Sequence, residues 1–196
     1  MSKAIDRELS ETLWRSARTF DDLCALGERF VTGELTFFPG WLAPTLDVES
    51  DAIAAHLARL CRSGFLTLAS QPGRGEHPAH DGTPCLQRAF VTGFTSRALA
   101  RTLARRATEC AIEILVFDAG VSEREIPVST RDGVPYAFTG HDATADELDC
   151  FEDCVSAEAL AALRDARYVA AVDLTWGRED VLWNELERIV AGGDVS

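Results

Sequence analysis

The chain has 196 residues, of which 46% are hydrophobic and 26% charged, a balance typical of one folded domain rather than a disordered segment. The formal net charge of −13 lies in the second half, because residues 1–110 are balanced while residues 111–196 carry 6 basic and 19 acidic residues. This distribution argues against non-specific nucleic-acid binding, which needs clustered positive charge.

The first twenty residues are rich in charge and lack the apolar core of a secretory signal. No window approaches the ~18 apolar residues of a membrane span. We therefore expect a cytoplasmic protein without a membrane partner. Its six cysteines are expected to be reduced and mostly buried.

Residues 1–64 are predicted to form a helical layer. Ser10 and Thr19 are expected to cap two helices, since each precedes hydrophobic residues at helical spacing. An aromatic loop follows at 36–44, and residues 47–64 predict a third helix that ends at a glycine.

Residues 65–193 are predicted to contain the sheet. Strands are expected over 65–70, 85–94, 112–120 and 167–178, with weaker strands around an Arg-Asp-Gly turn within 121–140. Helices are expected over 95–110, 156–165 and 179–193, whereas 71–84 reads as a loop. The fold class is therefore α/β or α+β, as a single domain over 1–196 with a mixed central sheet and an N-terminal helical layer.

Four of these strands end on polar loops that contain glycine. In open α/β sheets, ligands bind beyond the carboxyl ends of the strands, so these ends predict a polar ligand site. Its candidate residues are Ser70, Gln71, Thr95, Asp118, Asp173, Trp176 and Arg178. One alternative stays open: without a helix in 71–84, strand 65–70 would be antiparallel to the next strand, and its end would leave the cluster.

Several of these side chains also have structural interpretations. A carboxylate that ends a buried strand needs a partner, so Asp173 is expected either to pair with Arg178 or to contact a ligand. Trp176 is expected either in the core or stacked on a flat ligand. Gln71 has no role in a Pro-Gly turn, although a bond to its own backbone would explain it.

Metal binding is not predicted. His77, His80 and Cys85 lie close in sequence, as do Cys150 and Cys154, but their spacings do not match structural zinc sites. No ligand set or cofactor is assigned from them.

No catalytic motif assigns a reaction either. The chain lacks a phosphate-binding glycine loop and a nucleophile elbow. A nucleophilic Ser70 with His77, His80 or His141 as base stays open, but nothing selects it. The acidic run at 142–153 is interpreted as a solvated face.

The segments SGFLTLASQPG, CLQRAFVTGF and DLTWGREDVLW, in this order and spacing, resemble the pattern of an uncharacterised actinobacterial family common in Streptomyces. The family has no assigned activity, so the resemblance implies no catalytic residues. It implies that Gln71, Gln87, Arg88, Trp176 and Arg178 act as one set.

Two functions follow from the sequence. The first is a small-molecule-binding domain with its site at the strand ends, one form of which is an enzyme of actinobacterial specialised metabolism. The second is an acidic interaction module, such as an immunity or inhibitor protein, whose 111–196 surface binds a basic protein partner.

Overall fold

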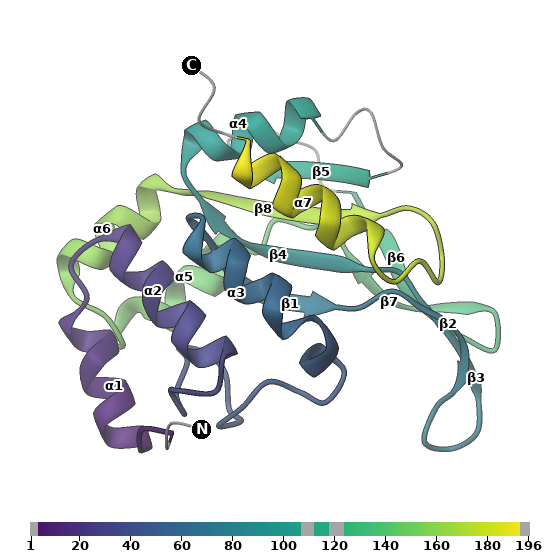
Figure 1. The fold of residues 1–196 in the computed structure, drawn as a ribbon, viewed down its shortest axis with the longest axis horizontal. Helices are drawn as coiled ribbons and strands as arrows, with labels where there is room; N and C mark the ends of the chain where they lie inside the picture. Colours follow the sequence, from purple (N-terminus) through teal and green to yellow (C-terminus); the bar gives the residue numbers. More distant parts are fainter. Residues whose placement is uncertain (1–3, 107–111, 118–123, 193–196) are drawn as a thin grey trace.

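Two antiparallel sheets and the helices around them appear in a computed structural model, which describes residues 4–106, 112–117 and 124–192 (Figure 1). These residues contain seven α-helices and eight strands, so the expected α+β class is confirmed, as a single domain. None of the helices in these ranges combines the length and apolar character required to cross a membrane.

The N-terminal helices are α1 (Arg7–Ser16), α2 (Phe20–Val31), a short 3-10 turn at Ser50–Ile53 and α3 (Ala54–Arg62). Thr19 caps α2 as expected, because its side chain and that of Asp22 exchange bonds with each other's backbone N–H. The expected cap at Ser10 is wrong. Asp6 caps α1 instead, and Ser10 lies inside the helix, where its buried hydroxyl accepts a hydrogen bond from the Thr36 N–H.

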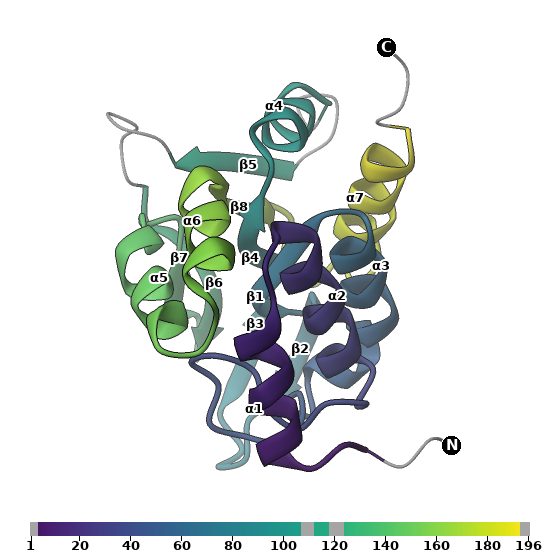
Figure 2. The same cartoon turned by 90° about the vertical axis from the view of Figure 1, so that its left-hand side faces the viewer.

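The first sheet has the order β1-β4-β8-β5. Its strands are β1 (Phe65–Gln71), β4 (Phe90–Thr95), β8 (Arg167–Asp173) and β5 (Ile112–Phe117). Along β8, Tyr168 and Ala170 pack with α1, α5 and α6, whereas Val169 and Ala171 pack with α3, α4 and α7. Figure 2 shows the sheet between these two groups of helices. A strand covered on both faces explains the continuous apolar run in its sequence.

The remaining helices are α4 (Arg97–Arg106), α5 (Thr144–Glu152), α6 (Ala157–Asp165) and α7 (Val181–Ala191). Three of them match the expected ranges at 95–110, 156–165 and 179–193. Helix α5 matches none of the expected helices, because the composition of the acidic run at 142–153 indicates a solvated face without fixing a helix there.

The second sheet has the order β2-β3-β6-β7, with β2 (Arg74–Pro78), β3 (Pro84–Gln87), β6 (Ile126–Arg131) and β7 (Val134–Thr139). The expected turn in 121–140 is confirmed at Asp132 and Gly133, both with positive φ. The loop expected at 71–84 is instead partly a hairpin, β2–β3. The strand expected over 85–94 is divided at Arg88 into one strand of each sheet.

All pairings in both sheets are antiparallel, so the mixed central sheet expected from the sequence is not what the structure has. In the first sheet β1 and β8 run the same way, and β4 and β5 run the opposite way. The ends of β1 and β8, Gln71 and Asp173, therefore share one edge, whereas Thr95 lies at the other. The expectation that all four strand ends converge is wrong, because each strand is antiparallel to its neighbours and alternate strands therefore end at opposite edges.

Candidate functional site

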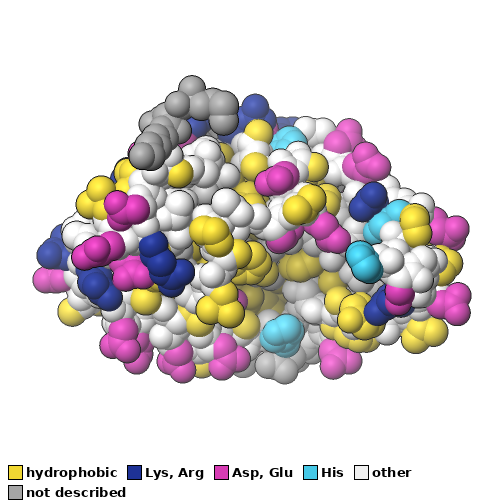
Figure 3. Space-filling model, turned by 90° about the horizontal axis from the view of Figure 1, so that it is seen from below, with side chains coloured by type: hydrophobic (Ala, Val, Ile, Leu, Met, Phe, Trp, Pro, Cys, Tyr) yellow, Lys and Arg dark blue, Asp and Glu magenta, His cyan; other side chains and the backbone are white. Residues whose placement is uncertain are grey.

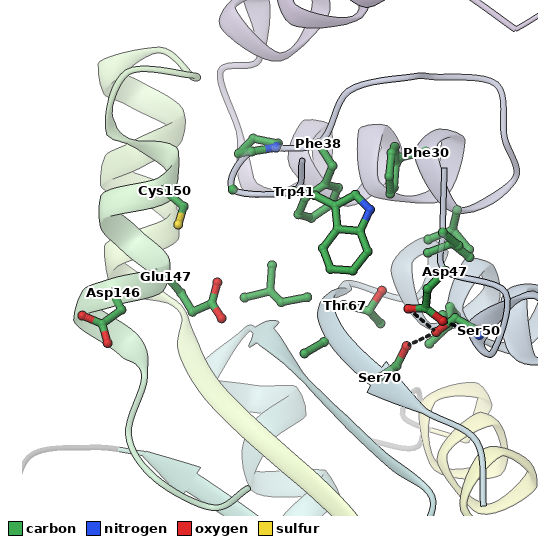
Figure 4. A pocket seen from close by; sticks show the side chains of 17 residues that line it. Phe30, Phe38, Trp41, Asp47, Ser50, Thr67, Ser70, Asp146, Glu147 and Cys150 are labelled. Carbon is green, nitrogen blue, oxygen red and sulfur yellow. Dashed lines mark hydrogen bonds between the residues drawn. The ribbon is translucent and has the colours of Figure 1, made fainter. Parts of the chain in front are cut away.

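A pocket of about 340 Å³ lies beside β1, which is an edge strand of the first sheet. Residues 38–50 form one wall of the pocket, and helix α5 forms the opposite wall (Figure 4). The lining is mostly hydrophobic, and Phe30, Phe38 and Trp41 supply aromatic rings. Polar side chains lie at two ends of it. Pockets with this balance of apolar walls and few polar groups are typical of small-molecule sites.

The wall at 38–50 is held by short-range contacts. The Trp41 N–H donates to the Phe38 carbonyl over 3.0 Å, and the Trp41 indole N–H donates to the Thr45 carbonyl over 2.9 Å. Gly40 has a φ of +77° and faces Cys150 of α5, where an added Cβ would lie 2.9 Å from Cys150 Sγ. The loop therefore reaches α5 at a position that accepts only glycine, and this contact closes one side of the pocket.

One polar end is formed by Asp47, Ser50 and Ser70. The Ser50 N–H donates to Asp47 Oδ1 over 2.8 Å, and its hydroxyl donates to Oδ2 over 3.2 Å. The hydroxyls of Ser50 and Ser70 are 3.5 Å apart. Asp47 is thus oriented by the start of the 3-10 turn, and a hydroxyl pair extends from it to the end of β1 (Figure 4).

Glu147 forms the other polar end. In Figure 4 its carboxylate points into the pocket, whereas that of the neighbouring Asp146 points away. Burial raises the pKa of Glu147 above its usual range, Asp146 adds to this, and His141 opposes it. Among the described residues, none donates a hydrogen bond to this carboxylate. The ionised form is therefore poorly compensated within the protein.

Two groups at the pocket are poorly suited to nucleophilic catalysis. Burial and then Glu147 raise the pKa of the Cys150 thiol, which keeps it protonated at neutral pH. Ser70 contacts Ser50, and no described histidine lies within hydrogen-bond reach of its hydroxyl. The alternative of a Ser70–His pair therefore has no support in the described residues.

Figure 3 shows the face of the molecule onto which the pocket opens. A hollow lies at its centre, with hydrophobic side chains inside and acidic side chains on the rim. The lysine and arginine side chains visible on this face lie away from the hollow, whereas one histidine lies at its rim. Within the described part of the chain, no lysine, arginine or histidine lines the pocket.

Most of the residues predicted from the strand ends lie elsewhere, in a joint where the two sheets meet. The predicted residues in this joint are Gln71, Asp173, Trp176 and Arg178. Gln71 donates from Nε2 to the carbonyls of Arg88 and Val128, over 2.9 and 3.0 Å. Its Oε1 accepts from the Ser129 hydroxyl over 3.0 Å. All of these partners lie on other strands or between them, so Gln71 ties β1 to the second sheet rather than bonding its own backbone.

Asp173 is fully buried and pairs with Arg178, one of the two partners considered from the sequence. The guanidinium donates to both carboxylate oxygens over 2.6 Å, and the Thr175 N–H donates to Oδ1 over 2.8 Å. This bidentate pair fixes the loop between β8 and α7.

The same loop contacts the β1–β2 turn and β3. The Gly177 N–H donates to the Gln87 carbonyl over 2.9 Å. The guanidinium carbon of Arg88 lies 4.0 Å from the centre of the Trp176 ring, so an arginine already occupies one face of this indole. A Cβ added at Gly73 would lie 1.9 Å from the Arg178 carbonyl oxygen, which shows how closely the two loops approach.

A family model described as a domain of unknown function, DUF6919, matches residues 9–193. The chain belongs to the DUF6919 family. No curated protein matches it. The match covers both the pocket and the joint, so both are parts of the family's domain rather than additions to it.

The remaining predicted site residues of this DUF6919 chain are Ser70, Thr95 and Asp118. Ser70 lines the pocket, and of the six candidates that the structure describes it alone does so. The Thr95 hydroxyl donates to the Gly64 carbonyl over 2.8 Å at the opposite edge of the sheet, where it joins β4 to the end of α3. Asp118 lies outside the described residues.

A second and more open hollow, of about 640 Å³, lies over the second sheet of the DUF6919 domain. Gln71, His77, His80 and Cys85 line it. Within the ranges that the structure describes, no three His, Cys, Asp or Glu side chains are grouped to hold a metal ion. The expectation that these residues bind no metal stays a prediction.

The sequence of the DUF6919 domain does not predict the pocket beside β1, although two segments that line it have unusual compositions. The loop at 36–44 is rich in aromatic residues, and it supplies Trp41. The acidic run at 142–153 has the composition of a solvated face, yet it supplies Glu147 and Cys150. Neither segment indicates by itself that the two lie opposite each other.

Proposed function

We propose that this protein binds a small, largely apolar molecule in the pocket between β1, residues 38–50 and α5. The observation that carries the proposal is a cavity of about 340 Å³ with aromatic walls and polar groups at two ends. This volume is at the small end of the ~300–1,000 Å³ range of ligand pockets. The small-molecule hypothesis from the sequence is kept, but its site moves from the joint to the pocket.

The contacts at the joint support this move. The polar atoms of Gln71 and the Asp173 carboxylate are occupied by protein partners, which leaves little for a ligand to bind. The pocket instead offers the Glu147 carboxylate and the Ser70 hydroxyl to a bound molecule. We assign no reaction to it. An actinobacterial source and a role in specialised metabolism stay predictions from the resemblance. A basic protein partner for the acidic second half stays a prediction from the charge distribution.

The test is to fill the pocket from β1. Ala69 lines the pocket and its side chain is exposed, so Ala69→Trp places an indole in the cavity without disturbing the core. We expect the wild-type protein to bind the neutral fluorescent dye phenylnaphthylamine with a blue shift and an increase in emission. Ala69→Trp should weaken this binding about tenfold or more, because the dye and the indole compete for one volume.

The control is Ala98→Trp, which adds the same side chain to an exposed position on α4, away from the pocket. Both variants should keep a melting temperature close to that of the wild type. If the wild-type protein gives no dye response, or if both variants bind the dye equally well, the proposed function is wrong.

A further inference from the structure

The charged side chains of the pocket indicate the chemical class of its ligand. This inference rests on the proposed function. The ionisable side chains that line the pocket are Asp47, Asp146, Glu147 and the thiol of Cys150. The hydroxyl side chains that line it are Ser50, Thr67 and Ser70. None of the described residues that line it is basic. An anionic ligand would meet repulsion here without a compensating partner.

Glu147 is the acidic side chain best placed to contact a bound ligand. Its carboxylate points into the cavity and is partly buried, and no described residue donates a hydrogen bond to it. A carboxylate in such surroundings is destabilised when ionised, unless a positive charge comes close. Among the residues that the structure describes, His141 is the one basic group whose charge acts on this carboxylate, and this histidine is exposed and does not line the cavity.

The aromatic wall adds a second attraction for positive charge. Trp41 projects into the pocket across from Glu147 (Figure 4), and its indole N–H is already bound to the Thr45 carbonyl. The donor of this ring is therefore already used, and the aromatic ring itself lines the cavity. Indole is the aromatic group that best attracts a cation, and the attraction increases when water is excluded.

We propose that the pocket is selective for organic cations, namely molecules with a protonated amine on a small apolar body. The ammonium group lies beside Glu147, where it supplies the hydrogen bonds that the carboxylate lacks. Trp41 contacts the ammonium-bearing end of the molecule, and its apolar body lies against Phe38. The hydroxyl of Ser50 or Ser70 forms a hydrogen bond with a second polar group where the molecule has one.

Competition against phenylnaphthylamine tests the inference with three probes of similar size: phenethylamine, phenethyl alcohol and phenylacetate. On the wild-type protein, phenethylamine should displace the dye about tenfold more effectively than the alcohol, and phenylacetate should be the weakest, because a charge-assisted hydrogen bond contributes about this much. Glu147→Gln should reduce the preference for the amine over the alcohol to about twofold or less, while the dye still binds.

The matched control is Asp149→Asn, which removes one negative charge from the exposed side of the same helix. It should keep the tenfold preference, which separates a contact with Glu147 from a general effect of net charge. If the dye binds but the amine and the alcohol compete equally on the wild-type protein, the inference is wrong while the proposed function stands. If the dye does not bind, the proposed function fails first.

Discussion

Gly73→Ala is expected to destabilise the protein by about 3 kcal/mol or more, because the new methyl group would lie 1.9 Å from the Arg178 carbonyl oxygen. The oxygen belongs to the backbone of a loop that the Asp173–Arg178 pair holds in place, so neither side of the contact yields easily. For a chain of this length, such a loss lowers the melting temperature by about 6–12 °C.

Gly75→Ala is the control for this variant. It makes the same change two residues later, where an added Cβ meets nothing within 4 Å. Its free energy of unfolding should stay within about 0.5 kcal/mol of the wild type. Thermal and urea unfolding of both variants check the prediction. Equal stabilities for the two would show that the β1–β2 turn does not pack against the loop before α7 as described.

Asp173→Asn is expected to cost about 2–4 kcal/mol, because the amide keeps the shape of the side chain but not its charge. The carboxylate is fully buried and accepts three hydrogen bonds, two of them from the Arg178 guanidinium. In the variant, either the amide NH₂ faces another donor or one guanidinium bond is lost. Urea unfolding measures the change in free energy.

Asp180→Asn provides the comparison. Asp180 is exposed and caps α7 without a side-chain hydrogen bond, so its substitution should change stability by less than about 0.5 kcal/mol. If Asp173→Asn were as stable as Asp180→Asn, the buried pair would not be a structural contact. The ligand interpretation of Asp173 would then regain support.

The sequence predicts those features of the fold whose contacts join residues close together in the chain. The helix cap at Thr19 and the Asp132–Gly133 turn depend on partners within a few residues, and the sequence predicts both. The Asp173–Arg178 pair was also one of two stated alternatives, because five positions separate its members. Ser10 shows the limit: it resembles a helix cap, but its hydroxyl is used by the Thr36 backbone, far along the chain.

The pocket could not be predicted because its parts meet only in the folded chain. Trp41 comes from a loop after α2, Ser70 from the end of β1 and Glu147 from α5. The acidic run around Glu147 has the composition of a solvated helix face, and only the position of α5 against residues 38–50 turns one of its carboxylates inward. The antiparallel pairing of β1 with β4, an alternative that the sequence leaves open, is confirmed, although the end of β1 still shares an edge with the end of β8.

The binding site can be located directly through the four tryptophan side chains, each of which gives one indole N–H signal in a ¹H–¹⁵N correlation spectrum. Single Trp→Phe variants assign these signals. Trp41 lines the pocket, Trp176 lies at the joint, and Trp14 and Trp183 are buried. On titration with phenylnaphthylamine, the Trp41 signal should shift most, in proportion to dye binding, while that of Trp176 stays in place. A shift of the Trp176 signal with an unmoved Trp41 signal would place the ligand at the joint and contradict the site proposed here.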